Sequence, residues 1–146
     1  MKLDIGCGNK KKEGYVGLDI SKNSDADIIA SALDIPIEDG RVSRINCSHL
    51  LEHFNPIEAR QLFNEIYRIL EIGGRAFIKV DRDWTYKRLM RKDPIHKYRY
   101  SRREIAGMLT HFATKKVEQK VYLYGKRLKK KIFVELVKAK LSEGEK

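Results

Sequence analysis

Two glycines and an acidic residue near the amino terminus are spaced as in a nucleotide-binding site. Gly6 and Gly8 flank Cys7 directly after a short apolar segment, and a second apolar segment ends at Asp19. Glycines at the end of a buried strand let backbone amides approach a ligand with no Cβ in the way. A carboxylate such as that of Asp19 can accept hydrogen bonds from both hydroxyls of a ribose. This spacing predicts a ligand that contains a nucleoside.

A second pair of residues narrows the choice of nucleotide. Asp34 and Ile35 follow a third apolar segment, where a carboxylate and a backbone amide would meet the edge of an adenine. A dinucleotide is disfavoured, because its G-x-G-x-x-G fingerprint requires a third glycine where Lys11 stands. The link after Gly8 is also too short for the helix whose amino end holds a pyrophosphate. The pattern favours adenine and ribose without phosphate, and leaves a dinucleotide-dependent oxidoreductase as a distant alternative.

The elements that must position these residues are short apolar strands. Runs bounded by Gly, Asp or Ser are typical of parallel strands that are covered on both faces. We expect four such strands, at Lys2–Gly6, Tyr15–Ile20, Asp27–Ala32 and Arg44–Ser48. Ligands of an open α/β sheet bind at the carboxyl ends of the strands, so the Gly-Cys-Gly turn and the acidic residues should meet there.

The clearest helix is predicted at Asn55–Glu71. Asn55 and Glu58 have the spacing of a capping box, and apolar residues then recur at helical spacing. The glycines at positions 73 and 74 are expected to end this helix before a strand at Arg75–Asp81.

The rest of the chain predicts one more helix and a hairpin. Ser101 and Glu104 again have capping-box spacing, and strands are expected at Lys116–Tyr124 and Lys131–Lys140 with a basic turn between them. This order indicates an α/β, Rossmann-like single domain over residues 1–146. Its seven-stranded sheet is mostly parallel, with an antiparallel edge hairpin and reduced amino-terminal helices.

The charge is distributed unevenly along the 146 residues. Residues 1–81 carry 11 Lys and Arg against 13 Asp and Glu, residues 82–103 carry 9 against 2, and residues 115–140 carry 10 against 2. With Trp84 and several tyrosines among them, the basic stretches favour an anionic or nucleic-acid substrate. A heat-adapted composition, as in a thermophile, explains the same charges equally well. The sequence has no RRM or KH signature.

Cysteine usage and hydropathy exclude other classes of protein. Cys7 and Cys47 have no metal-type spacing, so we expect free buried thiols. No apolar run approaches the roughly 20 residues that span a bilayer, and we expect a cytoplasmic protein with no membrane partner.

Four segments together resemble the class I S-adenosylmethionine (SAM) dependent methyltransferases of the HxLEH type. These segments are LDIGCG, GYVGLDIS, ALDIPIEDGRVSRINCSHLLEHF and IYRILEIGGRAFIKVD, and the resemblance covers roughly residues 2–112. Two positions depart from the family pattern: Lys10 replaces the third glycine of the loop, and Ile72 replaces the proline of the LxPGG turn. Helices that usually cover the pocket at the amino terminus are also missing, so we expect a more open pocket.

The resemblance implies SAM as the cofactor and a set of residues around it. It implies that Asp4, Gly6 and Gly8 line the methionine moiety, that Asp19 holds the ribose, and that Asp34 and Ile35 meet the adenine. Residues 47–49 would close over the sulfonium. The cofactor-binding residues expected in full are Asp4, Gly6, Cys7, Gly8, Asp19, Ile20, Asp34, Ile35, Cys47, Ser48 and His49.

Candidate residues for catalysis and for acceptor binding lie further along the chain. His49 and Asp81 are the catalytic candidates, and Asp81 and Asp83 end the strand that usually supplies acceptor contacts. The segment DPIHKYRYS resembles a family element before the last helix, which adds the substrate candidates His96, Tyr98 and Tyr100. His49 and His53 share a helical spacing beside Glu52, but no third ligand is evident, so we expect no metal.

The sequence therefore predicts a SAM-dependent methyltransferase with an unidentified acceptor, which is a small molecule, a protein or an RNA. A general base is required only for an acceptor that is protonated near neutral pH. The alternative is a non-catalytic module of the same fold that binds adenosine or nucleic acid. The oligomeric state is left open.

Overall fold

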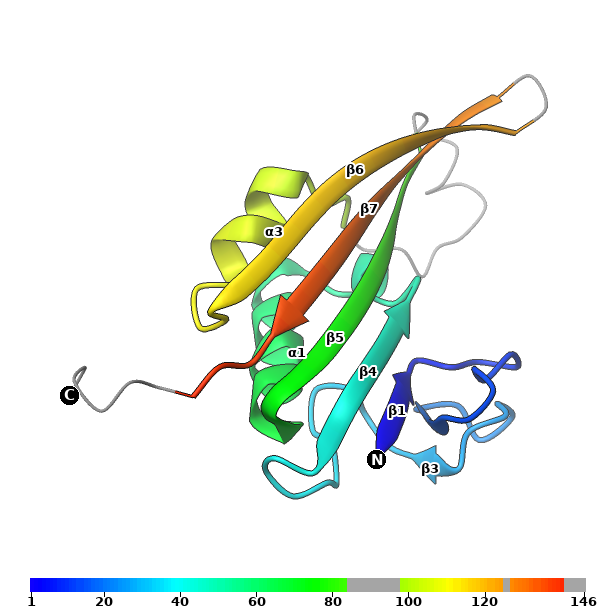
Figure 1. The fold of residues 1–146 in the computed structure, drawn as a ribbon. Coiled ribbons are helices and arrows are strands. Elements are labelled where there is room, and N and C mark those ends of the chain that lie inside the picture. The colour runs from blue at the N-terminus through cyan, green and yellow to red at the C-terminus, as the bar shows by residue number, and fades with distance from the viewer. Residues whose placement is uncertain (84–97, 125–126, 141–146) are drawn as a thin grey trace.

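The computed structural model describes residues 1–83, 98–124 and 127–140, which form one seven-stranded sheet (Figure 1). The strands, in chain order, are β1 (Lys2–Ile5), β2 (Val16–Asp19), β3 (Ile28–Ile29), β4 (Val42–Ser48), β5 (Leu70–Asp83), β6 (Thr114–Tyr124) and β7 (Arg127–Val137). Their order across the sheet is β3-β2-β1-β4-β5-β7-β6. The first five are parallel and β7 and β6 are antiparallel, which confirms the predicted fold class.

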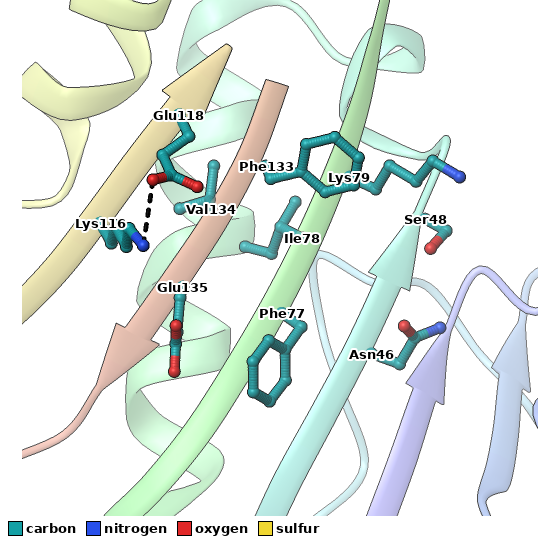
Figure 2. Close-up of a pocket in the computed structure, with 10 residues that line it drawn as sticks. All are labelled: Asn46, Ser48, Phe77, Ile78, Lys79, Lys116, Glu118, Phe133, Val134 and Glu135. Carbon is teal, nitrogen blue, oxygen red and sulfur yellow. Dashed lines mark ion pairs between the residues drawn. The ribbon is translucent and has the colours of Figure 1, made fainter. Parts of the chain in front are cut away.

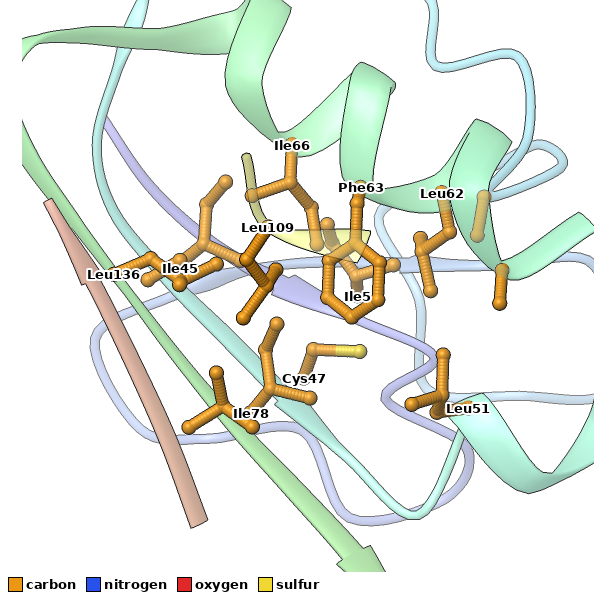
Figure 3. Packing of buried hydrophobic residues seen from close by; sticks show 14 of the residues in the cluster. Ile5, Ile45, Cys47, Leu51, Leu62, Phe63, Ile66, Ile78, Leu109 and Leu136 are labelled. Carbon is orange, nitrogen blue, oxygen red and sulfur yellow. The ribbon is translucent and has the colours of Figure 1, made fainter. Parts of the chain in front are cut away.

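The helices of the described residues pack on one face of this sheet. They are the 3-10 turn η1 (Leu51–His53), α1 (Pro56–Ile69) and α3 (Arg102–Met108), and Figure 1 shows α1 and α3 behind the strands. Leu62, Phe63 and Ile66 of α1 are buried against side chains of the central strands, as Figure 3 shows. The hydrophobic core therefore lies between this helical layer and a single face of the sheet.

Both predicted capping boxes are present. The Asn55 side chain accepts from the amides of Ile57 and Glu58, and the Glu58 carboxylate accepts from the Asn55 amide in return. Ser101 and Glu104 make the same exchange at the start of α3. These local signals were sufficient to locate where each helix begins.

The end of α1 differs from the prediction. The helix ends at Ile69, and β5 begins at once with Leu70, because Leu70 pairs with Val42 at the start of β4. The next paired residues, Arg44 and Arg75, show that residues 71–74 bulge out of the ladder. The two glycines therefore form an irregularity within β5 rather than the end of the helix.

The third strand is also shorter than predicted. It pairs only at Ile28 and Ile29, so Ala30, Ser31 and Ala32 already lie beyond its carboxyl end. The thiols of Cys7 and Cys47 are free and buried, as expected. No helix within the described ranges is long and apolar enough to cross a membrane.

Candidate functional site

A hollow of about 390 Å³ lies at the carboxyl ends of β1 and β2, beside the turn that follows β4. Its volume is within the range of small-molecule sites. Most of its lining is apolar or small, with one carboxylate and two imidazoles. The lining residues are Gly6, Gly8, Leu18, Asp19, Ile20, Ala30, Ser31, Ala32, His49, Leu50, His53 and Phe54.

The Gly-Cys-Gly turn forms one wall of this hollow. Gly6 and Gly8 have φ angles of 68° and 54°, in the left-handed region that favours glycine. The amides of Gly6 and Cys7 both donate to the carbonyl of Leu18, at 2.7 and 3.3 Å. A Cβ on Gly6 would lie 3.0 Å from the side chain of Leu50, whereas the space at Gly8 is open. The turn is thus held against β2 with its backbone exposed to the hollow.

Asp19 ends β2 and closes the same wall. Its Oδ2 accepts from the Gly8 amide at 2.9 Å, and its Oδ1 accepts from the Ser21 amide at 2.9 Å. Each carboxylate oxygen has a second lone pair, so both can still accept from a ligand. The two amides fix the carboxylate at the position where a ribose diol is expected.

The segment between β1 and β2 contains no helix. Residues 6–15 form turns, and the Lys11 ammonium pairs with Asp27 at 2.9 Å instead of facing the hollow. None of the described residues that line the hollow is a lysine or arginine. Apolar walls and the Asp19 carboxylate fit an adenosine, and no lysine or arginine of the described lining is placed to pair with a pyrophosphate.

His49, which lines this hollow, forms an ion pair with Asp81, which lies outside the lining. Nδ1 of His49 lies 2.7 Å from Oδ2 of Asp81 and 3.8 Å from Oε1 of Glu52. The two side chains come from neighbouring strands, since His49 follows β4 and Asp81 lies near the end of β5. The Glu52 carboxylate is buried, and it accepts from the Asp81 amide at 2.8 Å. Glu52 therefore fixes the backbone that carries Asp81.

This pairing changes the acidity of both groups. The hydrogen bond to Asp81 and the nearby Glu52 carboxylate raise the pKa of His49 to about 9, against the opposing effect of its partial burial. Burial raises the pKa of Asp81, but the hydrogen bond and charge of His49, together with Lys131, outweigh it and lower the pKa overall. In the absence of a ligand, the pair is an imidazolium and a carboxylate near neutral pH.

The backbone of His49 is also unusual. Its φ of 57° is the only positive value among the non-glycine residues that the structure describes. Such a conformation costs free energy and persists where the surrounding contacts determine it. Here the His49 amide donates to the Lys79 carbonyl at 2.9 Å, which turns the imidazole towards Asp81.

The donor atoms of His49, Glu52 and Asp81 lie within 4.8 Å of one another, as they would around a metal ion. Sequence reasoning had considered His53 as the second ligand, and it did not find this group of three. Two of these three atoms, Nδ1 of His49 and Oδ2 of Asp81, are already hydrogen-bonded to each other. We therefore interpret the group as an ion-pair cluster.

Four other predicted cofactor residues lie outside the lining of the hollow. Asp4 is buried, and its carboxylate accepts from the Lys12 amide and the Asn46 side chain, so it holds the turn in place. Cys7 lies within the turn, and burial raises the pKa of its thiol. Cys47 is fully buried in the core, which also raises its pKa, and Ser48 lies in a different hollow on the opposite face of the sheet. None of the four lines the hollow.

The predicted adenine contacts also lie outside the lining. Asp34 is exposed, and Ile35 is buried with its amide donating to Glu65 at 2.8 Å. Sequence reasoning missed Ala30, Ser31 and Ala32, which take this place because β3 ends early. It also missed Leu18, Leu50 and Phe54. The run of small residues at positions 30–32 was the feature of the sequence from which this part of the lining could have been predicted.

The substrate candidates after β5 have different surroundings. The Tyr98 hydroxyl donates to Glu104 at 2.7 Å, and the buried Tyr100 hydroxyl donates to the Phe54 carbonyl at 2.6 Å. Tyr100 therefore helps to hold Phe54, a residue that lines the hollow. Asp83 ends β5 opposite Lys129. His96 lies outside the described residues.

A seven-stranded sheet in this order, with a hollow at the carboxyl ends of its strands, defines a class I methyltransferase fold. A family model described as a methyltransferase domain matches residues 3–78, which is 76 of the 146 residues. The chain therefore belongs to this methyltransferase family, whose methyl donor is SAM. A search of curated proteins gave no match to the sequence.

Solved structures with the same fold come from several organisms. Phosphoethanolamine N-methyltransferase 2 of Haemonchus contortus, in complex with phosphomonomethylethanolamine and S-adenosylhomocysteine, superposes with a TM-score of 0.77 at 15% identity. That match covers 95% of this chain and 48% of the Haemonchus chain, so this chain spans about half its length. YcgJ of Bacillus subtilis has a TM-score of 0.71 at 16% identity, covering 96% of this chain and 92% of its own.

A third similar structure is a SAM-dependent methyltransferase of Thermotoga maritima, described as a possible histamine N-methyltransferase. It has a TM-score of 0.74 at 14% identity, covering 94% of this chain and 81% of its own. At these identities the similarity establishes the fold.

Proposed function

We propose that this chain transfers a methyl group from SAM to an acceptor whose nucleophilic atom carries a proton. The observation that supports it is the His49–Asp81 pair at 2.7 Å, in which His49 also lines the hollow proposed for the cofactor. SAM supplies an already activated methyl group when bound, so the protein has mainly to align the acceptor and exclude water.

His49 is the proposed general base in this reaction. Its neutral form accepts the proton of the acceptor, for example from a hydroxyl group, and Asp81 positions the ring and stabilises the imidazolium that results. A pKa of about 9 leaves His49 largely protonated at pH 7. Binding of a positive charge in the hollow favours the neutral form, since like charges disfavour ionisation.

The cofactor half of this proposal is tested by calorimetry with SAM and S-adenosylhomocysteine. Asp19→Ala removes the carboxylate expected to hold the ribose, and a hydrogen bond to a charged group contributes about 1.5–3 kcal/mol. We expect at least about tenfold weaker binding from this change. Asp19→Asn keeps the size and one acceptor, and should be intermediate.

Asp25→Ala is the matched control, because Asp25 is an exposed acid six positions away that does not line the hollow. It should bind SAM like the wild type. Wild-type affinity in both Asp19 variants, or no binding of either ligand to the unmodified protein, would refute the proposed site.

The transfer half is tested with labelled SAM and fractionated cell extract. We expect label to enter one fraction, and His49→Asn to abolish this while leaving SAM affinity within about threefold. Transfer at the wild-type rate by the variant would contradict a role as base. SAM binding without transfer to any fraction would instead favour the non-catalytic adenosine-binding module.

A further inference from the structure

One face of the sheet is exposed to solvent in the part of the chain that the structure describes. Cross-strand partners share a face, so the register identifies the side chains that point away from α1 and α3. We call this set the open sheet face. On strands β4 to β7, the members whose side chains the structure describes are Arg44, Asn46 and Ser48 of β4, Arg75, Phe77, Lys79 and Asp81 of β5, Lys129, Lys131, Phe133, Glu135 and Val137 of β7, and Lys116, Glu118, Lys120 and Tyr122 of β6.

The open sheet face is strongly basic. The members named above include seven lysines and arginines and three acids. Each acid already has a basic partner on the face: Asp81 with Lys131 at 3.6 Å, Glu118 with Lys116 at 3.0 Å, and Glu135 with Arg75 at 3.6 Å. Burial and the neighbouring Lys131 ammonium lower the pKa of Lys79, so these two cations lie close enough to repel. A bound anion would relieve that repulsion.

Aromatic rings lie among these charges, on three adjacent strands. Phe77 of β5 is 38% exposed and Tyr122 of β6 is 43% exposed. Phe133 of β7 lies edge-on to Tyr122, with 6.3 Å between ring centroids, and the Lys120 ammonium lies 5.3 Å from its centre. Neighbouring exposed rings that form a patch rimmed by polar residues are typical of a binding surface.

A hollow of about 230 Å³ connects the rings with the polar groups (Figure 2). Phe77, Phe133 and Lys79 line it, together with the Asn46 amide and the Ser48 hydroxyl of β4. The carboxylates of Glu118 and Glu135, which pair with Lys116 and Arg75, also line it. The hollow thus offers a nucleotide rings for the base to stack on, an amide and a hydroxyl for its edge, and an ammonium for its phosphate.

We propose that the open sheet face binds single-stranded nucleic acid. A sheet that presents aromatic rings among basic residues stacks unpaired bases and neutralises the backbone, and it does so with little sequence preference. A duplex hides its bases from such rings. A second copy of the chain would place two strongly positive faces against each other, which like-charge repulsion disfavours.

The position of the hollow links this surface to the proposed methyl-transfer site. Asp81 is two residues beyond Lys79 on the same strand and face, and His49 directly follows Ser48. A strand bound in the hollow would therefore extend to the His49–Asp81 pair. The binding itself does not depend on methyl transfer and is tested without SAM.

The test is fluorescence anisotropy with a fluorescein-labelled 12-mer of uridylate, titrated with the unmodified protein between 50 and 300 mM KCl. We expect binding that weakens steeply with salt. Phe77→Ala and Phe133→Ala should each weaken it at least fivefold, and Phe77→Tyr should retain it. Lys79→Gln with Lys120→Gln should reduce the slope of log affinity against log salt by about 0.7 per lost phosphate contact.

Matched controls lie on the other side of the molecule. Ile57→Ala and Arg60→Ala change exposed residues of α1, and should leave the affinity within about twofold. Circular dichroism checks that each variant folds. The proposal is overturned if the oligonucleotide does not bind or if the lysine variants match Arg60→Ala. Tighter binding of a duplex would also overturn it, as would a dimer, detected by sedimentation, that Phe77→Ala dissociates.

Discussion

The His49–Asp81 pair predicts that part of the stability of the molecule depends on pH. The folded-state pKa of His49, about 9, lies above the ordinary value of 6.5. A group with a raised pKa contributes stability that is complete below its unfolded pKa and is lost as the pH rises through the folded value. We expect Asp81→Asn to lower the free energy of unfolding most at pH 6, and progressively less towards pH 9.5.

Urea unfolding at several pH values measures this dependence, and NMR titration of the four histidines measures the cause. The His49 resonance, assigned with His49→Asn, should titrate near 9 in the wild type and closer to 6.5 in Asp81→Asn. Asp25→Asn, at an exposed site, is the control. A His49 midpoint near 6.5 in the unmodified protein would rule out the ion pair in solution.

Both residues of this pair were predictable as candidates, but their contact was not. His49 stood in the SHLLEHF motif, and Asp81 stood at the end of an expected strand. The contact depends on the register of β4 on β5, where Ser48 lies beside Lys79, and on the left-handed backbone of His49. Neither is encoded in local spacing. Glu52 was missed as a partner of Asp81 because its burial is a property of the folded core.

Between elements, Arg68 of α1 holds the loop that follows the cofactor hollow. Its guanidinium donates to the carbonyls of Ile35 and Ile37 at 2.8 Å, and to the carboxylates of Glu65 and Asp39. A lysine ammonium cannot make this planar set of contacts. We expect Arg68→Lys to lower the free energy of unfolding by about 1–3 kcal/mol, because the carbonyls of Ile35 and Ile37 each lose a donor in a partly buried site.

Urea unfolding at pH 7 checks this value. Arg60→Lys, at an exposed position of the same helix, should stay within about 0.5 kcal/mol of the wild type. Equal effects of the two substitutions would mean that the loop is held by its own turns, and that Arg68 contributes only a surface charge.

The elements themselves were predictable where the signal was local. Asn55 with Glu58 and Ser101 with Glu104 located both helix starts, because a capping box is complete within four residues. The end of α1 was misplaced because pairing of Leu70 with Val42 determines it, across 28 positions of sequence. The short β3 has the same explanation. It pairs at two residues only, so residues 30–32 line the hollow and residues 34–35 do not.

At the scale of the whole molecule, the sequence indicated the fold class but not the surface that follows from it. The excess of lysine and arginine over residues 115–140 was visible in the composition. That these lysines share a face with Phe77 and Phe133 depends on the antiparallel register of β7 against β5 and β6. Because the described helices cover the other face, the same register buries Ile132, Val134 and Leu136 in the core.

This single core predicts that the cofactor half and the hairpin unfold together. Ile66 of α1 is fully buried in a cluster that includes Ile5 of β1, Ile45 of β4 and Leu136 of β7. Ile66→Ala leaves a cavity at this junction, and substitutions of this kind cost about 2–5 kcal/mol. We expect a lower Tm and one cooperative transition, with the same midpoint in far-UV and near-UV circular dichroism.

The control is Ile57→Ala, because the Ile57 side chain is 80% exposed on the same helix. This substitution should change the free energy of unfolding by no more than about 0.5 kcal/mol. Two separate transitions in Ile66→Ala would show that β6 and β7 fold independently of the nucleotide-binding strands.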